Sequence, residues 1–232
     1  MAKRRPVLPE GYDLESFLIA KLLAKGANVL FIYNTDYERI QRYVRDLGIH
    51  ATIMNDDLTE LEKARNYGFD VISGNINSDI WAEMQPKQFD YLVIDEFFNS
   101  ARYPYDTLLR FNYVAKYIVI CHKNQAYWRK RLRFLFSGSH FVKNQWEIVN
   151  DGPEAWFNRE PWLFSHKDIV NLCSCAELKI KKGIIMYKNG IIDNMYDIRS
   201  YPNLYAYKMF YLISNEDNIT TPLFKLGGLE AL

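Results

Sequence analysis

The sequence has little cysteine, proline or glycine, and almost no net charge. Three cysteines in 232 residues are an odd number and too few for a disulfide framework, which favours a reducing compartment. Eight prolines and eleven glycines exclude a collagenous or low-complexity chain. With 29 basic and 28 acidic side chains, the formal net charge is +1, so no overall attraction to nucleic acid or to an anionic membrane exists.

The sequence also lacks a long uninterrupted apolar run near its start. It begins with the basic stretch MAKRRPVLPEG, but Glu10, Asp13, Glu15, Lys21 and Lys25 interrupt the region where a signal peptide or a membrane helix would have to lie. We therefore expect no membrane span and a cytoplasmic location.

Apolar and aromatic residues are abundant, at 49% and 16% of the chain. This content is ample for a single hydrophobic core. We expect one α/β domain over residues 1–214, followed by a C-terminal tail at residues 215–232 whose role the sequence does not reveal.

Short apolar runs alternate with amphipathic stretches through the first half of the chain. The runs that predict buried strands are 28–33, 49–54, 69–73, 89–95 and 116–121. Two of the helical stretches between them begin with a capping-box pair, Thr35 with Glu38 and Thr59 with Glu62. This alternation predicts a doubly wound, mostly parallel sheet that is covered by helices on both faces.

The last part of the chain has a different pattern. Asn189 and Gly190 form a dipeptide that is typical of tight hairpin turns. The apolar run 204–214 follows and is long enough for a further strand. Together these features predict an antiparallel edge hairpin on the parallel sheet.

The loop after the first predicted strand is the place where a ligand would bind. In an open α/β sheet, ligands lie beyond the carboxyl ends of the strands, where the strand order reverses. A nucleotide-type ligand requires glycines there, but Tyr33, Thr35 and Tyr37 put bulk in that loop. After the second strand, Asp56 or Asp57 can bind ribose hydroxyls or form a turn, and the residues alone leave both readings open.

Five segments, in the order in which they occur, give the chain a family resemblance. They are VISGNINSDI, KQFDYLVID, YPYDTLLRFNYVAKYIVI, YWRKRLRFLFSG and WFNREPWLFSHKDIVNLCSCAEL. Over roughly residues 28–212 the chain resembles the MetW family, whose members have a class I S-adenosylmethionine methyltransferase fold and are associated with methionine biosynthesis. The resemblance implies a Rossmann-like, seven-stranded sheet, S-adenosylmethionine as the cofactor to consider, and homoserine O-acyltransferase as the partner.

The chain departs from the family in the first cofactor motif. The family reads VLDLGCGDGE, whereas residues 29–38 of this chain read VLFIYNTDYE. Tyr33, Thr35 and Tyr37 thus replace three glycines, while Asp36 and Glu38 are kept. Bulky side chains in a rigid glycine loop produce a steric conflict with a cofactor that such a loop cannot relieve cheaply.

Two further positions of the family's cofactor site are changed. The acidic residues that the family uses for the ribose and near the adenine correspond to Asn55 and Asn75. Each lost carboxylate removes charge-assisted hydrogen bonds worth about 1.5–3 kcal/mol. With Asp95 at the carboxyl end of the fourth strand, these residues complete an altered or vestigial cofactor site, and we expect no cofactor to bind there unless the pocket is still open.

No other catalytic set stands out in the sequence. The four histidines are scattered, and none has metal-ligand spacing with another. The pair Cys121 and His122 at the end of the fifth strand suggests a nucleophile, but a buried cysteine at a strand end is usually part of the core. We predict neither catalytic residues nor a metal site.

A basic and aromatic stretch after the fifth strand predicts a surface helix. The residues that it offers to a partner are Tyr127, Trp128, Arg129, Arg131 and Arg133. Arginine and aromatic side chains anchor protein interfaces. They also stack on bases and bind phosphates in RNA, and the plain solvated face of an amphipathic helix has the same composition.

These observations lead to three functional hypotheses. The first is a MetW-like pseudoenzyme with a methyltransferase fold, which acts through protein contacts as an accessory or structural subunit of homoserine O-acyltransferase or of a larger assembly. The second is an active S-adenosylmethionine-dependent methyltransferase with an altered pocket. The third is RNA binding through the basic-aromatic helix, which the near-zero net charge disfavours.

Overall fold

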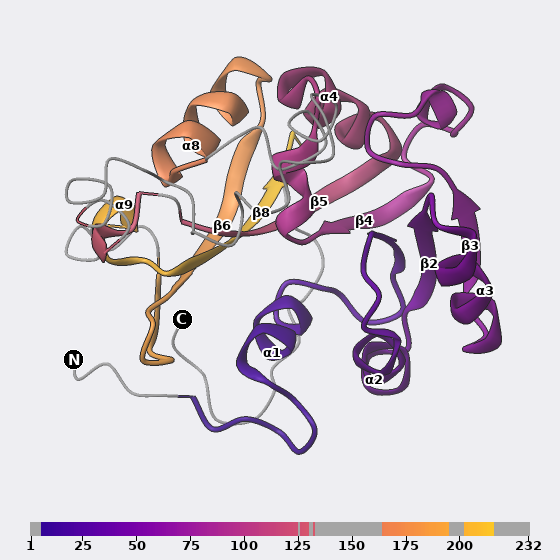
Figure 1. The fold of residues 1–232 in the computed structure, drawn as a ribbon, viewed down its shortest axis with the longest axis horizontal. Coiled ribbons are helices and arrows are strands. Elements are labelled where there is room, and N and C mark those ends of the chain that lie inside the picture. Colours follow the sequence, from indigo (N-terminus) through magenta and orange to yellow (C-terminus); the bar gives the residue numbers. More distant parts are fainter. Residues whose placement is uncertain (1–5, 125, 130–131, 133–163, 195–201, 216–232) are drawn as a thin grey trace, which may run out of the picture.

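The computed structural model describes residues 6–124, 126–129, 132, 164–194 and 202–215. Within these residues, one eight-stranded sheet has the order β3-β2-β1-β4-β5-β8-β6-β7 (Figure 1). The strands are β1 (Asn28–Ile32), β2 (His50–Asn55), β3 (Asp70–Ser73), β4 (Phe89–Ile94), β5 (Ala115–Lys123), β6 (Lys179–Met186), β7 (Ile192–Asn194) and β8 (Lys208–Ser214).

Strands β1 to β5 pair in parallel, and β8, β6 and β7 extend the sheet from β5 in antiparallel pairs. This arrangement confirms the predicted Rossmann-like, mostly parallel sheet with an antiparallel edge. The predicted count of seven strands is wrong. The additional strand is β7, which pairs with β6 because the turn at Asn189 and Gly190, where Gly190 has a φ of 78°, folds the chain directly back.

Helices cover both faces of the sheet, as a doubly wound fold requires. The helices are α1 (Leu14–Ala20), α2 (Tyr37–Leu47), α3 (Leu58–Asn66), α4 (Pro104–Val114), α8 (His166–Cys175) and α9 (Pro202–Tyr205), with short 3₁₀ turns η1 (Asp79–Ala82) and η2 (Glu96–Ser100). Residues of α1, α2 and α3 pack in one buried cluster with Val29 and Phe31 of β1. Residues of α4 and α8 pack in another with Leu30 and Ile32, and Figure 1 shows these helices on the opposite side of the sheet.

Two helix starts differ from the predicted capping boxes. Helix α2 is capped by Asp36, whose carboxylate accepts from the Arg39 N–H at 3.0 Å, rather than by Thr35. Helix α3 is capped by Asp57, which accepts from the Thr59 N–H at 2.8 Å. A charged carboxylate is a stronger acceptor than a threonine hydroxyl, so the aspartate takes the cap where both residues are near the helix start.

The described part of the chain contains no helix that is both long and apolar enough to cross a membrane. Strand β8 ends at Ser214, where the domain was expected to end. Residues 216–232 lie outside the described residues, so the division into a domain and a tail stays a prediction.

The core under α4 depends on Phe111, which is fully buried. Its ring centroid lies 5.2 Å from that of Trp81 and 6.3 Å from that of Phe98. Replacing Phe111 by Ala leaves a cavity among rigid rings, and we expect the free energy of unfolding to fall by about 3–5 kcal/mol. Urea denaturation measures this change.

The matched control is Tyr113→Ala on the same helix. Tyr113 is 49% exposed, so its truncation should change the free energy of unfolding by no more than about 0.5 kcal/mol. Equal losses in the two variants would contradict the assignment of these two faces of α4.

Candidate functional site

The strand order locates the candidate site at the carboxyl edge of the parallel strands. The order reverses between β1 and β4, which is the position where open α/β sheets bind ligands. Tyr33 follows β1, Asn55 ends β2, Asn75 follows β3 and Asp95 follows β4. The structure therefore brings these predicted site residues to one edge of the sheet.

Tyr33 lies across this edge. Its backbone has a φ of 54°, the left-handed region that favours glycine, and its N–H donates to Met54 O at 3.0 Å. Its phenol is hydrogen-bonded to the Asp56 side chain and to the backbone of Ile76. Burial, together with the charge and hydrogen bond of Asp56, raises the pKa of Tyr33. The Tyr33 side chain thus reaches from the end of β1 to residues that follow β2 and β3.

The other bulky residues of the loop lie elsewhere. Tyr37 is buried between α2 and α3, where its hydroxyl donates to Glu60 O at 2.9 Å, and its ring lies 5.4 Å from that of Tyr67. Thr35 is exposed. Of the three residues that replace the glycines of the family motif, Tyr33 alone is oriented across the carboxyl edge.

Asparagine side chains that follow the strands close turns in the backbone. The Oδ1 atoms of Asn34, Asn55, Asn75 and Asn124 each accept from the N–H two residues ahead, at 3.1, 3.0, 2.8 and 2.9 Å. The amide of Asn75 also donates to Asp56 Oδ2 at 3.2 Å. These Asx turns use the oxygens of Asn55 and Asn75 that would otherwise face a ribose or a base.

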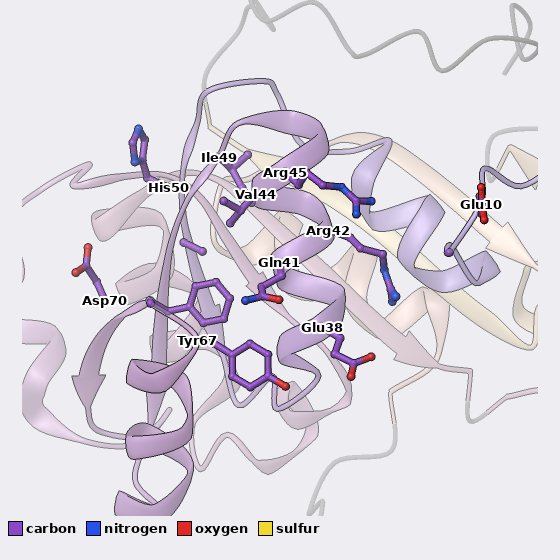
Figure 2. A pocket seen from close by; sticks show the side chains of 14 residues that line it. Glu10, Glu38, Gln41, Arg42, Val44, Arg45, Ile49, His50, Tyr67 and Asp70 are labelled. Atoms are coloured by element: carbon purple, nitrogen blue, oxygen red, sulfur yellow. The ribbon is translucent and has the colours of Figure 1, made fainter.

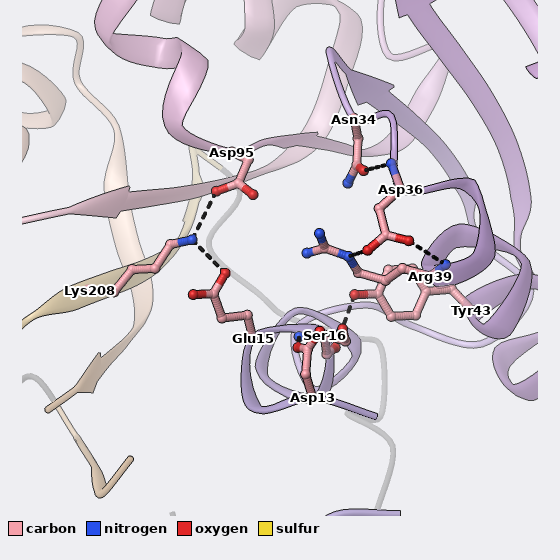
Figure 3. Close-up of polar contacts among 9 residues, drawn as sticks. All are labelled: Asp13, Glu15, Ser16, Asn34, Asp36, Arg39, Tyr43, Asp95 and Lys208. Atoms are coloured by element: carbon pink, nitrogen blue, oxygen red, sulfur yellow. Dashed lines mark hydrogen bonds and ion pairs between the residues drawn. The ribbon is translucent and has the colours of Figure 1, made fainter. Parts of the chain in front are cut away.

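Asp36 has a structural role of the same kind. Its carboxylate caps α2 and forms an ion pair with Arg39, with Oδ2 and Nε 3.1 Å apart (Figure 3). Its N–H donates to Asn34 Oδ1, which fixes the loop ahead of the helix. Asp36, one of the residues kept from the family motif, is thus held by contacts within its own chain.

A buried ion cluster occupies the same edge beside β4. The ammonium of Lys208, at the start of β8, lies 2.6 Å from Glu15 Oε2 of α1 and 3.3 Å from Asp95 Oδ1 (Figure 3). The Lys208 side chain is only 3% exposed. Asp95 Oδ1 is buried and accepts no hydrogen bond from the described residues. Its negative charge is therefore compensated by the ion pair with Lys208.

The protonation states in this cluster do not suit nucleophilic chemistry. Burial alone would lower the pKa of Lys208, but the charges of Asp95 and Glu15 and the hydrogen bond to Glu15 raise it well above the ordinary value. Burial, with Asp95 nearby, also raises the pKa of the Cys121 thiol. Lys208 is therefore an ammonium ion and Cys121 a thiol at neutral pH, while both nucleophiles must be deprotonated to react.

Two of the scattered histidines meet at Tyr211 on β8. The His122 ring is stacked with that of Tyr211 at a centroid distance of 5.6 Å, and His166 Nδ1 lies 3.1 Å from the Tyr211 hydroxyl. Burial lowers the pKa of His166. No group of histidines, cysteines and carboxylates suited to a metal occurs among the described residues.

The predicted basic-aromatic surface is only partly described. Tyr127 is buried, with its ring 6.0 Å from that of Tyr207, so it belongs to the core rather than to the surface. Arg129 is exposed and lies over the Trp128 ring at 5.2 Å. Arg131 and Arg133 lie outside the described residues.

A hollow of about 970 Å³ lies at the opposite edge of the sheet (Figure 2). Helix α2 contributes Glu38, Arg42 and Arg45, and the amino ends of β2 and β3 contribute His50 and Asp70. Both acidic and basic side chains line it. It is also remote from the edge where the predicted site residues gather.

No local sequence pattern marks the Lys208 cluster. Glu15, Asp95 and Lys208 come from α1, the end of β4 and the start of β8, and no motif links them. The one available hint was a lysine at the head of an otherwise apolar strand, because such a residue needs a buried partner.

Comparison with known proteins identifies both a family and a fold. A family model described as methionine biosynthesis protein MetW matches residues 13–213. No curated protein matches the chain. Among solved structures, a SAM-dependent methyltransferase from Thermotoga maritima, described as a possible histamine N-methyltransferase, is 14% identical with a TM-score of 0.58, and 88% of each chain is covered.

Two further methyltransferases have similar folds. A SAM-dependent methyltransferase from Aquifex aeolicus is 13% identical with a TM-score of 0.51, covering 87% of this chain and 89% of that one. The plantazolicin methyltransferase BamL, solved with SAH and a triazolic desmethylPZN analog, is 13% identical with a TM-score of 0.58, covering 88% and 85%. At these identities the similarity establishes the class I methyltransferase fold alone.

The ion cluster makes a prediction about stability. Lys208→Met leaves Glu15 and Asp95 facing each other without a cation, and we expect the free energy of unfolding at neutral pH to fall by about 3 kcal/mol. The control Lys63→Met removes an ion pair with Glu60 in which Lys63 is 60% exposed, and should cost no more than about 0.5 kcal/mol. Similar losses in urea denaturation of the two variants would contradict a stabilising role for Lys208.

The lowered pKa of His166 predicts a pH dependence. The folded protein holds His166 neutral, so the unfolded chain binds the proton more readily, and stability falls as the pH drops through the unfolded pKa of about 6.5. His166→Phe keeps a ring beside Tyr211 but cannot titrate. We expect the loss of unfolding free energy between pH 7.5 and about pH 5.5 to be smaller in this variant than in the wild type, and an unchanged loss would contradict the assignment.

Proposed function

Since this chain belongs to the MetW family and has the class I methyltransferase fold, we propose that it is a MetW-like protein whose S-adenosylmethionine site is closed by its own side chains. It then acts without catalysis, as an accessory or structural subunit through contacts with another protein. The proposal rests above all on one observation, which is the position of Tyr33 across the carboxyl edge.

The residues present do not fit S-adenosylmethionine. A glycine loop lets the backbone approach this class of ligand, but here a tyrosine side chain bridges from the end of β1 to Asp56 and Ile76. Moving it away would break its contacts with Asp56 and expose a ring that now packs on the apolar cluster beneath the sheet edge. The loop therefore hinders cofactor binding sterically.

The polar groups oppose the cofactor as well. Asn55 and Asn75 are neutral, and their oxygens already accept backbone hydrogen bonds. Two missing carboxylate contacts weaken binding by about 3–6 kcal/mol in total, which is about two to four orders of magnitude in the dissociation constant. The carboxylates of Glu15 and Asp95 are already paired with Lys208, whose single positive charge cancels one of their two negative charges.

The partner that we propose follows from the family. The family model that matches the chain is described as methionine biosynthesis protein MetW. The resemblance to this family implies homoserine O-acyltransferase as the protein that this chain contacts. Co-elution of the two purified proteins tests this part separately from cofactor binding.

Calorimetric titration with S-adenosylmethionine and with its demethylated product tests the closed site. We expect no binding by the wild-type protein at ligand concentrations up to about 1 mM, which corresponds to a binding free energy weaker than about −4 kcal/mol. Micromolar binding would overturn the proposal and favour an active methyltransferase with an altered pocket.

A variant series shows whether Tyr33 is the cause. Tyr33→Gly relieves the left-handed strain and opens the edge, and Tyr33→Gly with Asn55→Asp also restores a carboxylate at the end of β2. We expect the double variant to bind the cofactor measurably and Tyr37→Gly to remain without binding, because the Tyr37 side chain packs against α3 and is hydrogen-bonded to Glu60. Binding by Tyr37→Gly and not by the Tyr33 variants would contradict the assignment.

A further inference from the structure

Helix α4 has an exposed aromatic face that the fold does not use. Its buried side packs Leu108, Phe111 and Val114 against the sheet. The opposite side exposes Tyr105 by 43%, Leu109 by 38% and Tyr113 by 49%, and Tyr103, just ahead of the helix, is 64% exposed. We call these four residues the α4 tyrosine face.

The spacing places the face in one line. Tyr105, Leu109 and Tyr113 are four residues apart, so they lie above one another along about 12 Å of the helix. Large exposed apolar side chains elsewhere in the described residues, such as Leu58 on α3, do not form such a line. Single exposed apolar residues need no explanation, whereas a contiguous row indicates a contact surface.

The polar groups of the face define the chemistry of what it binds. The charged residues between positions 102 and 113 are Arg102, Asp106 and Arg110, which leaves one positive charge in excess in this segment, and Arg110 Nη1 also donates to Ser78 O at 3.3 Å. Asp106 lies in the first turn of α4, where the helix dipole already favours a carboxylate. The phenols of Tyr103, Tyr105 and Tyr113 make no hydrogen bond within the described residues and are free to donate.

We propose that the α4 tyrosine face docks an acidic amphipathic helix of a partner protein. A row of leucine-like side chains on that helix would pack along Tyr105, Leu109 and Tyr113, and its flanking carboxylates would accept from the arginines and the phenols. Tyrosine and arginine are the residues that most often dominate binding energy at such contacts. The inference rests on the proposed function, since it names the surface through which an accessory protein acts.

A second copy of this chain fits the face less well. Pairing the same surface with itself would bring together two positive surpluses, with two arginines for each aspartate. An acidic partner cancels the surplus instead, which gives both attraction and specificity.

The experiment uses a synthetic amphipathic helix with leucines on one side and glutamates beside them, and a second peptide with lysines in place of the glutamates. Fluorescence anisotropy measures the binding of each to the full-length protein. We expect the acidic peptide to bind about tenfold or more tightly than the basic one. Equal affinities, or no binding of either peptide, would overturn the proposal.

Two variants locate the binding surface. Leu109→Lys should raise the dissociation constant of the acidic peptide by about tenfold or more. Leu58→Lys, the same change at an exposed leucine of α3, should leave this dissociation constant unchanged. Arg110→Glu should reduce the preference for the acidic peptide. Circular dichroism confirms that each variant is folded, and an unchanged affinity of folded Leu109→Lys would overturn the proposal.

Analytical ultracentrifugation of the wild-type protein and of Leu109→Lys tests whether a second copy of the chain covers the α4 tyrosine face. Self-association that Leu109→Lys abolishes would show that another copy covers the face and would overturn the proposal. These outcomes are independent of the cofactor titration, because peptide binding at α4 does not involve the carboxyl edge. Failure of the docking proposal and failure of the closed-site proposal can therefore be told apart.

Discussion

The parallel pairing of β1 with both β2 and β4 is the constraint on which the rest of the structure depends. It makes the strand order reverse at β1 and gathers the carboxyl ends of neighbouring strands at one edge. In folds of this kind that edge receives a ligand. In this chain Tyr33 and Lys208 extend into it from β1 and β8, so the same topology produces a surface held together by internal contacts.

These contacts are costly to form and are maintained because each has several partners. A tyrosine with left-handed backbone geometry costs about 1–2 kcal/mol relative to an ordinary conformation, and burying an ammonium ion is far more expensive unless it is paired. Lys208 has two carboxylates, and Tyr33 has a carboxylate and a backbone group. The ion pairs of Lys208 thereby link α1, the end of β4 and β8 at this edge.

With the carboxyl edge closed as proposed, the functional surface that we propose lies on the outside of the molecule. Helix α4 uses one side to complete the core around Phe111 and leaves the other with tyrosines and arginines exposed. Of the basic-aromatic stretch expected to serve this purpose, the structure buries Tyr127 and leaves Arg129 on the surface. The α4 tyrosine face is therefore the more complete candidate for a protein contact in the described part of the chain.

The sequence by itself determined the alternation of strands and helices, the mostly parallel sheet and the edge where the altered motif residues meet, because strand and helix periodicity and the order of elements are local properties. Only the tertiary structure decided that Tyr33 rather than Tyr37 crosses that edge, since one positive φ turns the first side chain toward β2 and β3 and α3 captures the second. It also decided that Glu15, Asp95 and Lys208 meet and that the tyrosines of α4 face outward. Contacts between residues up to 193 positions apart depend on how the elements pack, and no local pattern encodes them.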